Sequence, residues 1–286
     1  MGKTWGMVAV ALGLLLALLV GLLAWGQWRW SAKTQALLQA LNAAAERERR
    51  PAPFDLRELD GLPEPVARHL RLVLPQGSTL IRAVEVTHEG EFNLSENGSR
   101  WRPFRSQQRV VLRRPGFVWD GRVSMAPGLA VHVHDAYVAG EGLLEPAIAG
   151  LFSLVQLRDR EATARGELMR FLAEATWYPT ALLPREGLQW EPIDAQHARA
   201  TLVDGELHLS LRVHFGTDGL IDRVHAEQRD RLVGGRSVPT PWEGRFSDYQ
   251  RRDGLLVPLQ GEVAWLTPQG RLPYWRGRIV ALRYER

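Results

Sequence analysis

Cysteine is absent from all 286 residues of this sequence. Its absence excludes disulfides, thiolate zinc sites and cysteine nucleophiles. Lysine is also scarce, because Lys3 and Lys33 are the only two and nearly all the positive charge is arginine. The sequence has no Walker loop, no dinucleotide fingerprint and no G-x-S-x-G elbow. We therefore expect no cofactor, no nucleotide-binding loop and no serine hydrolase.

The composition is that of an ordinary globular domain, with 45% hydrophobic and 24% charged residues. Disordered chains have fewer apolar residues and a larger net charge than this one. The net charge is +4 and the isoelectric point about 9.8. The arginines are scattered among acidic residues along the chain, which favours a dispersed, solvated surface over a nucleic-acid patch. We expect no nucleic-acid partner.

Residues 5–25 form a single apolar run, WGMVAVALGLLLALLVGLLAW, without one charge. As a helix this run is roughly 30 Å long, which matches the hydrocarbon core of a bilayer. Trp5 and Trp25 stand at its two ends, where amphipathic indoles favour the membrane interface. A cleaved signal peptide is the alternative, since Lys3 precedes the run. No small-x-small cleavage site follows, so we predict an uncleaved transmembrane anchor over residues 1–30.

The charges flanking this run do not decide its orientation, because Lys3 precedes it and Arg29 and Lys33 follow it. A very short head before a large C-terminal domain is typical of an uncleaved signal-anchor. We expect a single-pass protein of the bacterial cytoplasmic membrane with its domain on the periplasmic side. Residues 31–55 are predicted to form a helical stalk, and residues 56–286 a single β-rich domain.

The domain opens with a predicted amphipathic helix over residues 62–75, after which the apolar period changes from 3.6 to 2. Residues 207–215, for example, alternate strictly between apolar and polar side chains. This alternation and the turn residues predict about ten or eleven strands: 80–92, 104–113, 116–123, 131–138, 142–145, 199–203, 207–215, 220–227, 242–250, 255–266 and 274–284.

A helical segment is predicted between the two strand groups, over residues 146–183. An antiparallel sheet of this size usually curls or closes to hide its edges. The apolar stripe of Leu168, Phe171 and Leu172 would cover its concave face. We therefore expect a mainly β (α+β) fold, with a strongly curved antiparallel sheet or open half-barrel wrapped over a few helices.

Several phrases of the sequence resemble an uncharacterised bacterial family of unknown function, including LPEPVARHLRLVLP (62–75), PTPWEGRFSDY (239–249) and YWRGRI (274–279). This resemblance implies no established activity, so no functional residue is carried over from it. The predicted layout is also similar to that of the periplasmic lipoprotein carriers LolA and LolB, whose half-barrel shields a lipid-binding cavity. That second likeness is one of architecture, without a shared motif.

Two groups of polar residues are candidates for chemistry. His132 and His134 lie two apart on a predicted strand and could supply two zinc ligands from one face. Asp135 points the other way, so we predict solvent-facing histidines and no metal site. Glu243 and Glu262 could form a carboxylate pair for acid–base catalysis, although a single buried and hydrogen-bonded glutamate is the more common arrangement.

Aromatic residues in strands and at a helix end are the candidate ligand-binding residues: Trp119, Phe171, Trp177, Trp242 and Trp265. Aromatic side chains lining a cavity would suit an apolar ligand, although core packing explains any one of them as well. The leading hypothesis is a membrane-anchored, non-enzymatic domain that binds a lipid or other apolar ligand. The alternatives are an enzyme using Glu243 in a concave pocket, and an envelope protein–protein interaction module with an exposed apolar patch.

Overall fold

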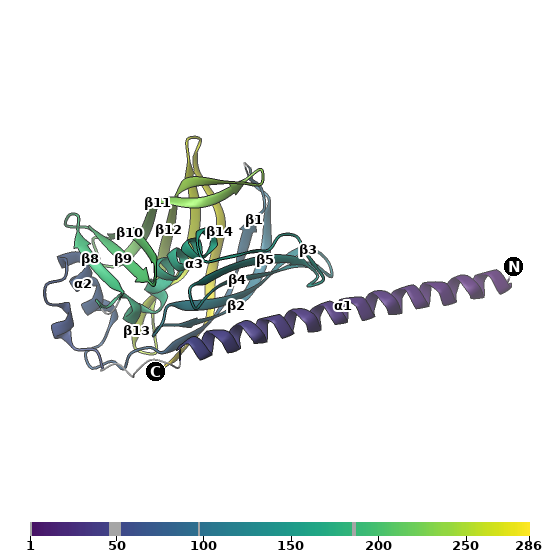
Figure 1. Ribbon diagram of the computed structural model, residues 1–286, viewed down its shortest axis with the longest axis horizontal. Helices are drawn as coiled ribbons and strands as arrows, with labels where there is room; N and C mark the ends of the chain where they lie inside the picture. Colours follow the sequence, from purple (N-terminus) through teal and green to yellow (C-terminus); the bar gives the residue numbers. More distant parts are fainter. Residues whose placement is uncertain (1, 46–52, 97, 185–186) are drawn as a thin grey trace.

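The computed structural model describes residues 2–45, 53–96, 98–184 and 187–286. In these ranges the chain forms one long N-terminal helix and one antiparallel sheet that curves around a short helix (Figure 1). The helices and 3-10 turns are α1 (Gly2–Ala45), η1 (Leu56–Leu59), α2 (Glu64–Val73), α3 (Ala162–Ala173), η2 (Glu174–Trp177) and η3 (Pro179–Leu182). The strands are β1 (Ala83–Asn93), β2 (Trp101–Val111), β3 (Gly116–Ala126), β4 (Leu129–Val138), β5 (Glu141–Ile148), β6 (Phe152–Ser153), β7 (Leu157–Asp159), β8 (Leu188–Pro192), β9 (His197–Asp204), β10 (Leu207–Phe215), β11 (Ile221–Val233), β12 (Arg236–Arg252), β13 (Leu255–Thr267) and β14 (Gly270–Glu285).

The strand order is β6-β5-β4-β3-β2-β1-β14-β13-β12-β11-β10-β9-β8, with β7 also paired to β5. Pairing of β1 with β14 joins the first meander to the last, so the two strand groups form one sheet. The predicted mainly β, curved antiparallel fold is confirmed. The predicted strand count is wrong, because the described residues form 14 strands and not ten or eleven. Of the three unpredicted strands, β6 and β7 have only two and three residues, too few to show an alternating pattern, whereas the five residues of β8 (LQWEP) do alternate and were overlooked.

Helix α3 lies in the hollow of the curved sheet (Figure 1). It contacts β3, β4 and β5 on one side and β10 and β11 on the other. Leu168, Phe171 and Leu172 are buried as predicted. The helix begins only at Ala162, because strands β6 and β7 occupy the first part of the segment predicted as helical. Its first turn lies so close to Gly142 that a Cβ there would come within 2.4 Å of the Ala164 nitrogen.

Helix α1 continues without a break through the predicted span and into the predicted stalk (Figure 1). In the described part of the chain it is the one helix long and apolar enough to cross a membrane, with a mean hydropathy of 2.8 in its most apolar window and none of that window buried. Its second half packs on the convex face of β2, β3 and β4. Leu41 and Ala45 form a small second core there with Val118 and Ala136. Residues 46–52 of the predicted stalk lie outside the described ranges.

A polar cluster fastens α1 to the sheet. The indole of Trp30 stacks on His134, with ring centroids 3.8 Å apart and planes 6° apart. Its Nε1 donates to Asp120 Oδ1 over 3.0 Å. The Thr34 hydroxyl lies 2.7 Å from His134 Nε2 and 3.1 Å from Asp120 Oδ2. We call this cluster, together with the ion pair between Lys33 and Glu145, the helix latch.

The prediction that His132 and His134 face solvent is wrong, because α1 covers them. Only 6% and 0% of their surfaces are exposed. On the same face, Lys33 Nζ lies 2.5 Å from the buried Glu145 carboxylate. No group of three or more histidine and acidic residues in the described ranges could hold a metal ion. His132 and His134 belong to the contact between α1 and the sheet.

Candidate functional site

A cavity of about 120 Å³ lies between α3 and the inner face of the sheet. We call it the concave cavity. Its aromatic walls are Phe92, Trp119, Trp177, Trp242, Phe246, Tyr274 and Trp275. Its charged wall residues are Asp135, Arg170, Glu174, Arg229 and Glu262. These residues come from both arms of the sheet and from α3, so only the curvature of the sheet brings them together.

Three of the strands that line the cavity carry the pattern W-x-G, at residues 119–121, 242–244 and 275–277. Residues i and i+2 of a strand share a face, so each indole can lie flat over the following glycine. A Cβ at Gly121 would come within 2.0 Å of the Trp119 ring, and one at Gly277 within 2.8 Å of the Trp275 ring. Glycine at these positions is therefore what allows the indoles to form the cavity wall.

Three of the five predicted ligand-binding residues line the concave cavity: Trp119, Trp177 and Trp242. The other two do not line it. Phe171 is buried in the core against Tyr178, and Trp265 stacks on Tyr274, which lines the cavity, with centroids 5.3 Å apart. The sequence analysis missed the other aromatic walls and, apart from Glu262, every charged one. The W-x-G pattern would have identified Trp275.

The charged wall is built around Arg170 of α3, whose side chain is 15% exposed. Its Nη1 lies 2.5 Å from Asp135 and its Nε 2.7 Å from Glu174. Its guanidinium also lies 4.9 Å from the ring of Phe117 and 5.3 Å from that of Trp119. Burial alone would lower the pKa of Arg170, but the two carboxylates outweigh burial and raise it. Arg170 is therefore a permanent cation stacked on aromatic rings.

Two further polar groups at this site lack a protein partner among the described residues. The indole nitrogens of Trp119 and Trp177 are buried, and no described residue accepts a hydrogen bond from them. Glu167, one turn before Arg170, is buried but does not line the cavity. Burial, and then the charge of Asp135 and a hydrogen bond with it, raise the pKa of Glu167 well above its usual value. Unpartnered buried donors are costly, about 1–3 kcal/mol each. They are natural contact points for a ligand oxygen.

Of the two candidate carboxylates, Glu262 lines the concave cavity and Glu243 does not. Side chains alternate along a strand, so Glu243 and Arg245 point away from the face that carries Trp242. Glu243 Oε1 accepts from Arg245 Nε over 2.7 Å and from Arg271 Nε over 2.9 Å, and Arg271 also lies 2.5 Å from Glu262. Burial would raise the pKa of Glu243, but these arginines lower it. An ionised carboxylate held by two guanidiniums is a poor general acid.

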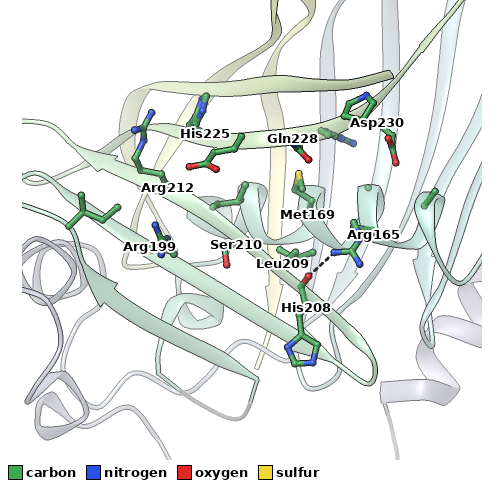
Figure 2. Close-up of a pocket in the computed structure, with 17 residues that line it drawn as sticks. Arg165, Met169, Arg199, His208, Leu209, Ser210, Arg212, His225, Gln228 and Asp230 are labelled. Carbon is green, nitrogen blue, oxygen red and sulfur yellow. Dashed lines mark hydrogen bonds between the residues drawn. The ribbon is translucent and has the colours of Figure 1, made fainter. Parts of the chain in front are cut away.

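A second, larger hollow of about 770 Å³ opens where β10 and β11 separate (Figure 2). We call it the wedge cleft. The two strands pair only between Arg212↔His225 and Phe215↔Ile221, and a bulge in β11 before Arg229 then directs it away. Helix α3 closes the base of the cleft, where Arg165 Nη1 donates to the His208 carbonyl over 2.8 Å (Figure 2).

The wedge cleft is rich in cationic side chains: Arg165, Arg199, Arg212 and Arg229, against the acids Glu227 and Asp230. Arg229 lines both this cleft and the concave cavity. Its guanidinium lies 5.1 Å from the ring of Trp242. The two hollows therefore share one cation, with polar walls on one side of it and aromatic walls on the other.

The stability of this region depends on pH through His88. Its ring is buried, 5.0 Å from the ring of Trp177 and 6.0 Å from that of Trp275. Burial, and next the nearby Arg170, lower the pKa of His88 to about 3. The unfolded chain binds a proton there below about pH 6.5 and the folded chain does not. The contribution of neutral His88 to the stability of the fold is therefore complete above pH 6.5 and is lost as the pH falls towards 3.

The Ser106 hydroxyl lies 3.3 Å from His88 Nδ1, and a glutamine side chain offers it another polar partner. We expect His88→Gln to flatten the pH dependence of unfolding between pH 6.5 and 4. The slope should decrease by up to about 1.4 kcal/mol per pH unit. Urea unfolding in detergent micelles, followed by tryptophan fluorescence at several pH values, measures the free energy of unfolding. Replacing the exposed His208 in the same way is the matched control and should leave the slope unchanged. Equal slopes for His88→Gln and the unmodified chain would contradict the assignment.

Comparisons with known proteins place the domain in a family. The model of a family of unknown function (DUF6920) matches residues 60–284. Five chains of known structure match, among them a LolA superfamily protein from Nitrosomonas europaea, with a TM-score of 0.40 and 10% identity, covering 78% of this chain and 92% of that one. A search of the curated proteins finds no match. The resemblance seen in the sequence is confirmed, and the chain belongs to the DUF6920 family.

Proposed function

We propose that this chain is a membrane-anchored, non-enzymatic binding protein whose concave cavity holds the apolar end of an amphipathic molecule such as a lipid. The observation that carries the proposal is an aromatic cavity with two unpartnered indole N–H groups and a stacked arginine on its walls. Ligand sites commonly combine such apolar walls with a few convergent polar groups.

The size of the cavity indicates how much of the ligand it holds. Its volume of about 120 Å³ is on the order of a cavity that accommodates benzene. It therefore suits one ring or a short alkyl segment and not a whole acyl chain. The rest of the molecule would extend past Arg229 into the wedge cleft, whose arginines suit an anionic head group.

The membrane anchor is the second part of this proposal. Residues 5–25 are uncharged and their described side chains are exposed in the structure, which suits a lipid environment and not water. We propose a single pass through the bacterial cytoplasmic membrane with the domain on the periplasmic side. In this arrangement the binding site is tethered next to a source of amphipathic molecules.

A substitution that fills the concave cavity with a larger side chain tests the binding proposal. A Cβ at Gly261 would lie 3.4 Å from the ring of Trp177 and 3.4 Å from that of Trp275. We expect Gly261→Leu to place its side chain in the cavity and to weaken binding of dansyl-undecanoic acid at least about tenfold, which is about 1.4 kcal/mol. Energy transfer from tryptophan to dansyl measures the affinity, in a chain that begins at Gly26 and keeps the helix latch.

The matched control is Ser247→Leu, which adds the same side chain to an exposed position on β12. It should bind the probe as the unmodified chain does. Absence of binding to the unmodified chain would overturn the proposal. Equal affinity for Gly261→Leu and the unmodified chain would show that the probe binds somewhere other than the concave cavity.

A further inference from the structure

Two uncharged segments of the chain lie side by side at one edge of the sheet. Residues 123–131 and 146–157 each lack any charged side chain. Pairing of Val131 with Ile148 brings the segments together, and the Ala149 amide donates to the Ala130 carbonyl over 2.9 Å. We call their exposed apolar side chains the apolar lip: Leu129, Ile148, Phe152, Leu154 and Leu157.

The side chains of the apolar lip are exposed. Phe152 is 65% exposed and Leu154 59%, and the remaining three are 36% to 42% exposed. Monomeric soluble proteins rarely expose large contiguous apolar patches, and such patches commonly bind membranes or proteins. The apolar lip therefore indicates a binding surface, and its position indicates what binds there.

The lip begins at the point where α1 leaves the predicted membrane span. A Cβ at Gly26 would come within 2.6 Å of the Leu151 side chain and 2.7 Å of the Ala149 carbonyl oxygen. Arg29 Nη1 donates to the Leu151 carbonyl over 3.4 Å. Gly26 directly follows Trp25, the last residue of the uncharged run, and one helical residue adds only about 1.5 Å of rise. The base of the lip thus lies at the depth of the interface.

The orientation of the domain is set by the helix latch. Trp30 and Thr34 bond to Asp120 and His134 on β3 and β4, within three turns of Gly26. The β3–β4 hairpin extends along α1 towards its N-terminus (Figure 1). A domain fastened in this way cannot turn its lip away from a bilayer that α1 crosses.

We propose that the apolar lip inserts into the interfacial layer of the bilayer and forms a second membrane contact beside the anchor. This inference rests on the membrane span of the proposed function. The lip has the composition expected at that depth, since its two segments are uncharged and arginines, Arg122 and Arg158, stand directly outside them. The exposed Trp28 lies on α1 at the same level, and indoles favour the interface.

The cysteine-free chain allows a direct measurement of depth. Single substitutions Phe152→Cys and Leu154→Cys in the full chain would carry a nitroxide label in nanodiscs of phosphatidylethanolamine and phosphatidylglycerol. Collision of the label with oxygen, which dissolves in lipid, is compared with collision with a water-soluble nickel chelate. We expect both labels to favour oxygen severalfold over a label at Leu232→Cys, an apolar position on β11 that is 54% exposed but belongs to neither segment.

A label at Leu15→Cys, in the middle of the span, separates the two proposals. If Leu15 favours oxygen while Phe152 and Leu154 match Leu232, the anchor stands and the lip does not enter the bilayer. That result would favour a protein partner for the lip. If the Leu15 label is also in water, the membrane anchor itself fails, and the inference about the lip falls with it.

Discussion

The double substitution Leu15→Arg, Leu16→Arg is expected to abolish membrane association while leaving the domain folded. Both leucines lie near the centre of the predicted span and are more than 60% exposed. An arginine at the centre of a transmembrane helix costs about 2.5–3.5 kcal/mol on insertion scales, so two should prevent insertion. Fractionation with salt and alkali measures the effect. The unmodified chain should be released only by detergent, because its attachment is not a screened charge contact.

The matched control places the same two charges on the same helix outside the span. Gln35 and Gln39 are exposed on α1 beyond Trp30. The variant Gln35→Arg, Gln39→Arg should remain an integral membrane protein. If the Leu15/Leu16 variant also resisted alkali, the helix would not be the anchor. A soluble unmodified protein that begins near residue 26 would instead identify a cleaved signal peptide.

Replacing Arg170 with methionine should be among the most destabilising single changes in the domain. The substitution keeps an apolar stem but leaves the carboxylates of Asp135 and Glu174 without their cation. Removing one partner of a buried ion pair typically costs about 3–5 kcal/mol, because the remaining charge is desolvated and uncompensated. The stacking on Phe117 and Trp119 is lost as well. Urea unfolding in detergent micelles measures the change in the free energy of unfolding.

Arg199 provides the matched control for this experiment. Its side chain is 51% exposed, and its 3.5 Å contact with Glu191 lies at the surface. Arg199→Met should change the free energy of unfolding by about 0.5 kcal/mol or less. Adding Glu174→Gln to Arg170→Met should recover part of the lost stability, because it removes one of the unpaired charges. Unchanged stability for Arg170→Met would show that this cluster is open to solvent.

The core strands could be predicted from the sequence because each has one buried face and one solvent-exposed face. Residues 207–215 were located at both ends by their alternation and by the turn residues beside them. The short strand β6 shows no such pattern, since two residues cannot alternate. It forms because β5 presents an edge with which the returning chain can pair. Its existence therefore depends on the neighbouring strand.

The candidate site could be predicted only in part, because its residue types are visible in the sequence and its long-range contacts are not. The tryptophans stood out by residue type, and three of them line the concave cavity. Arg170 and Arg229 could not be selected, because nothing local distinguishes them from the other arginines of the chain. Only packing of α3 against β4 places Arg170 beside Asp135, which is 35 residues away. Likewise, only the bulge in β11 brings Arg229 to Trp242.

The sequence by itself determined the apolar helix, the antiparallel strands and the curled sheet, because these follow from hydrophobic periods that repeat over many neighbouring residues. It also carried the motifs that place the chain in its family. The tertiary structure alone decided where α1 packs. That contact buried His132 and His134, which the sequence had placed in solvent, and brought the apolar lip to the end of the uncharged run. The physical reason is that a local pattern specifies which face of an element is apolar, whereas long-range packing decides what covers that face.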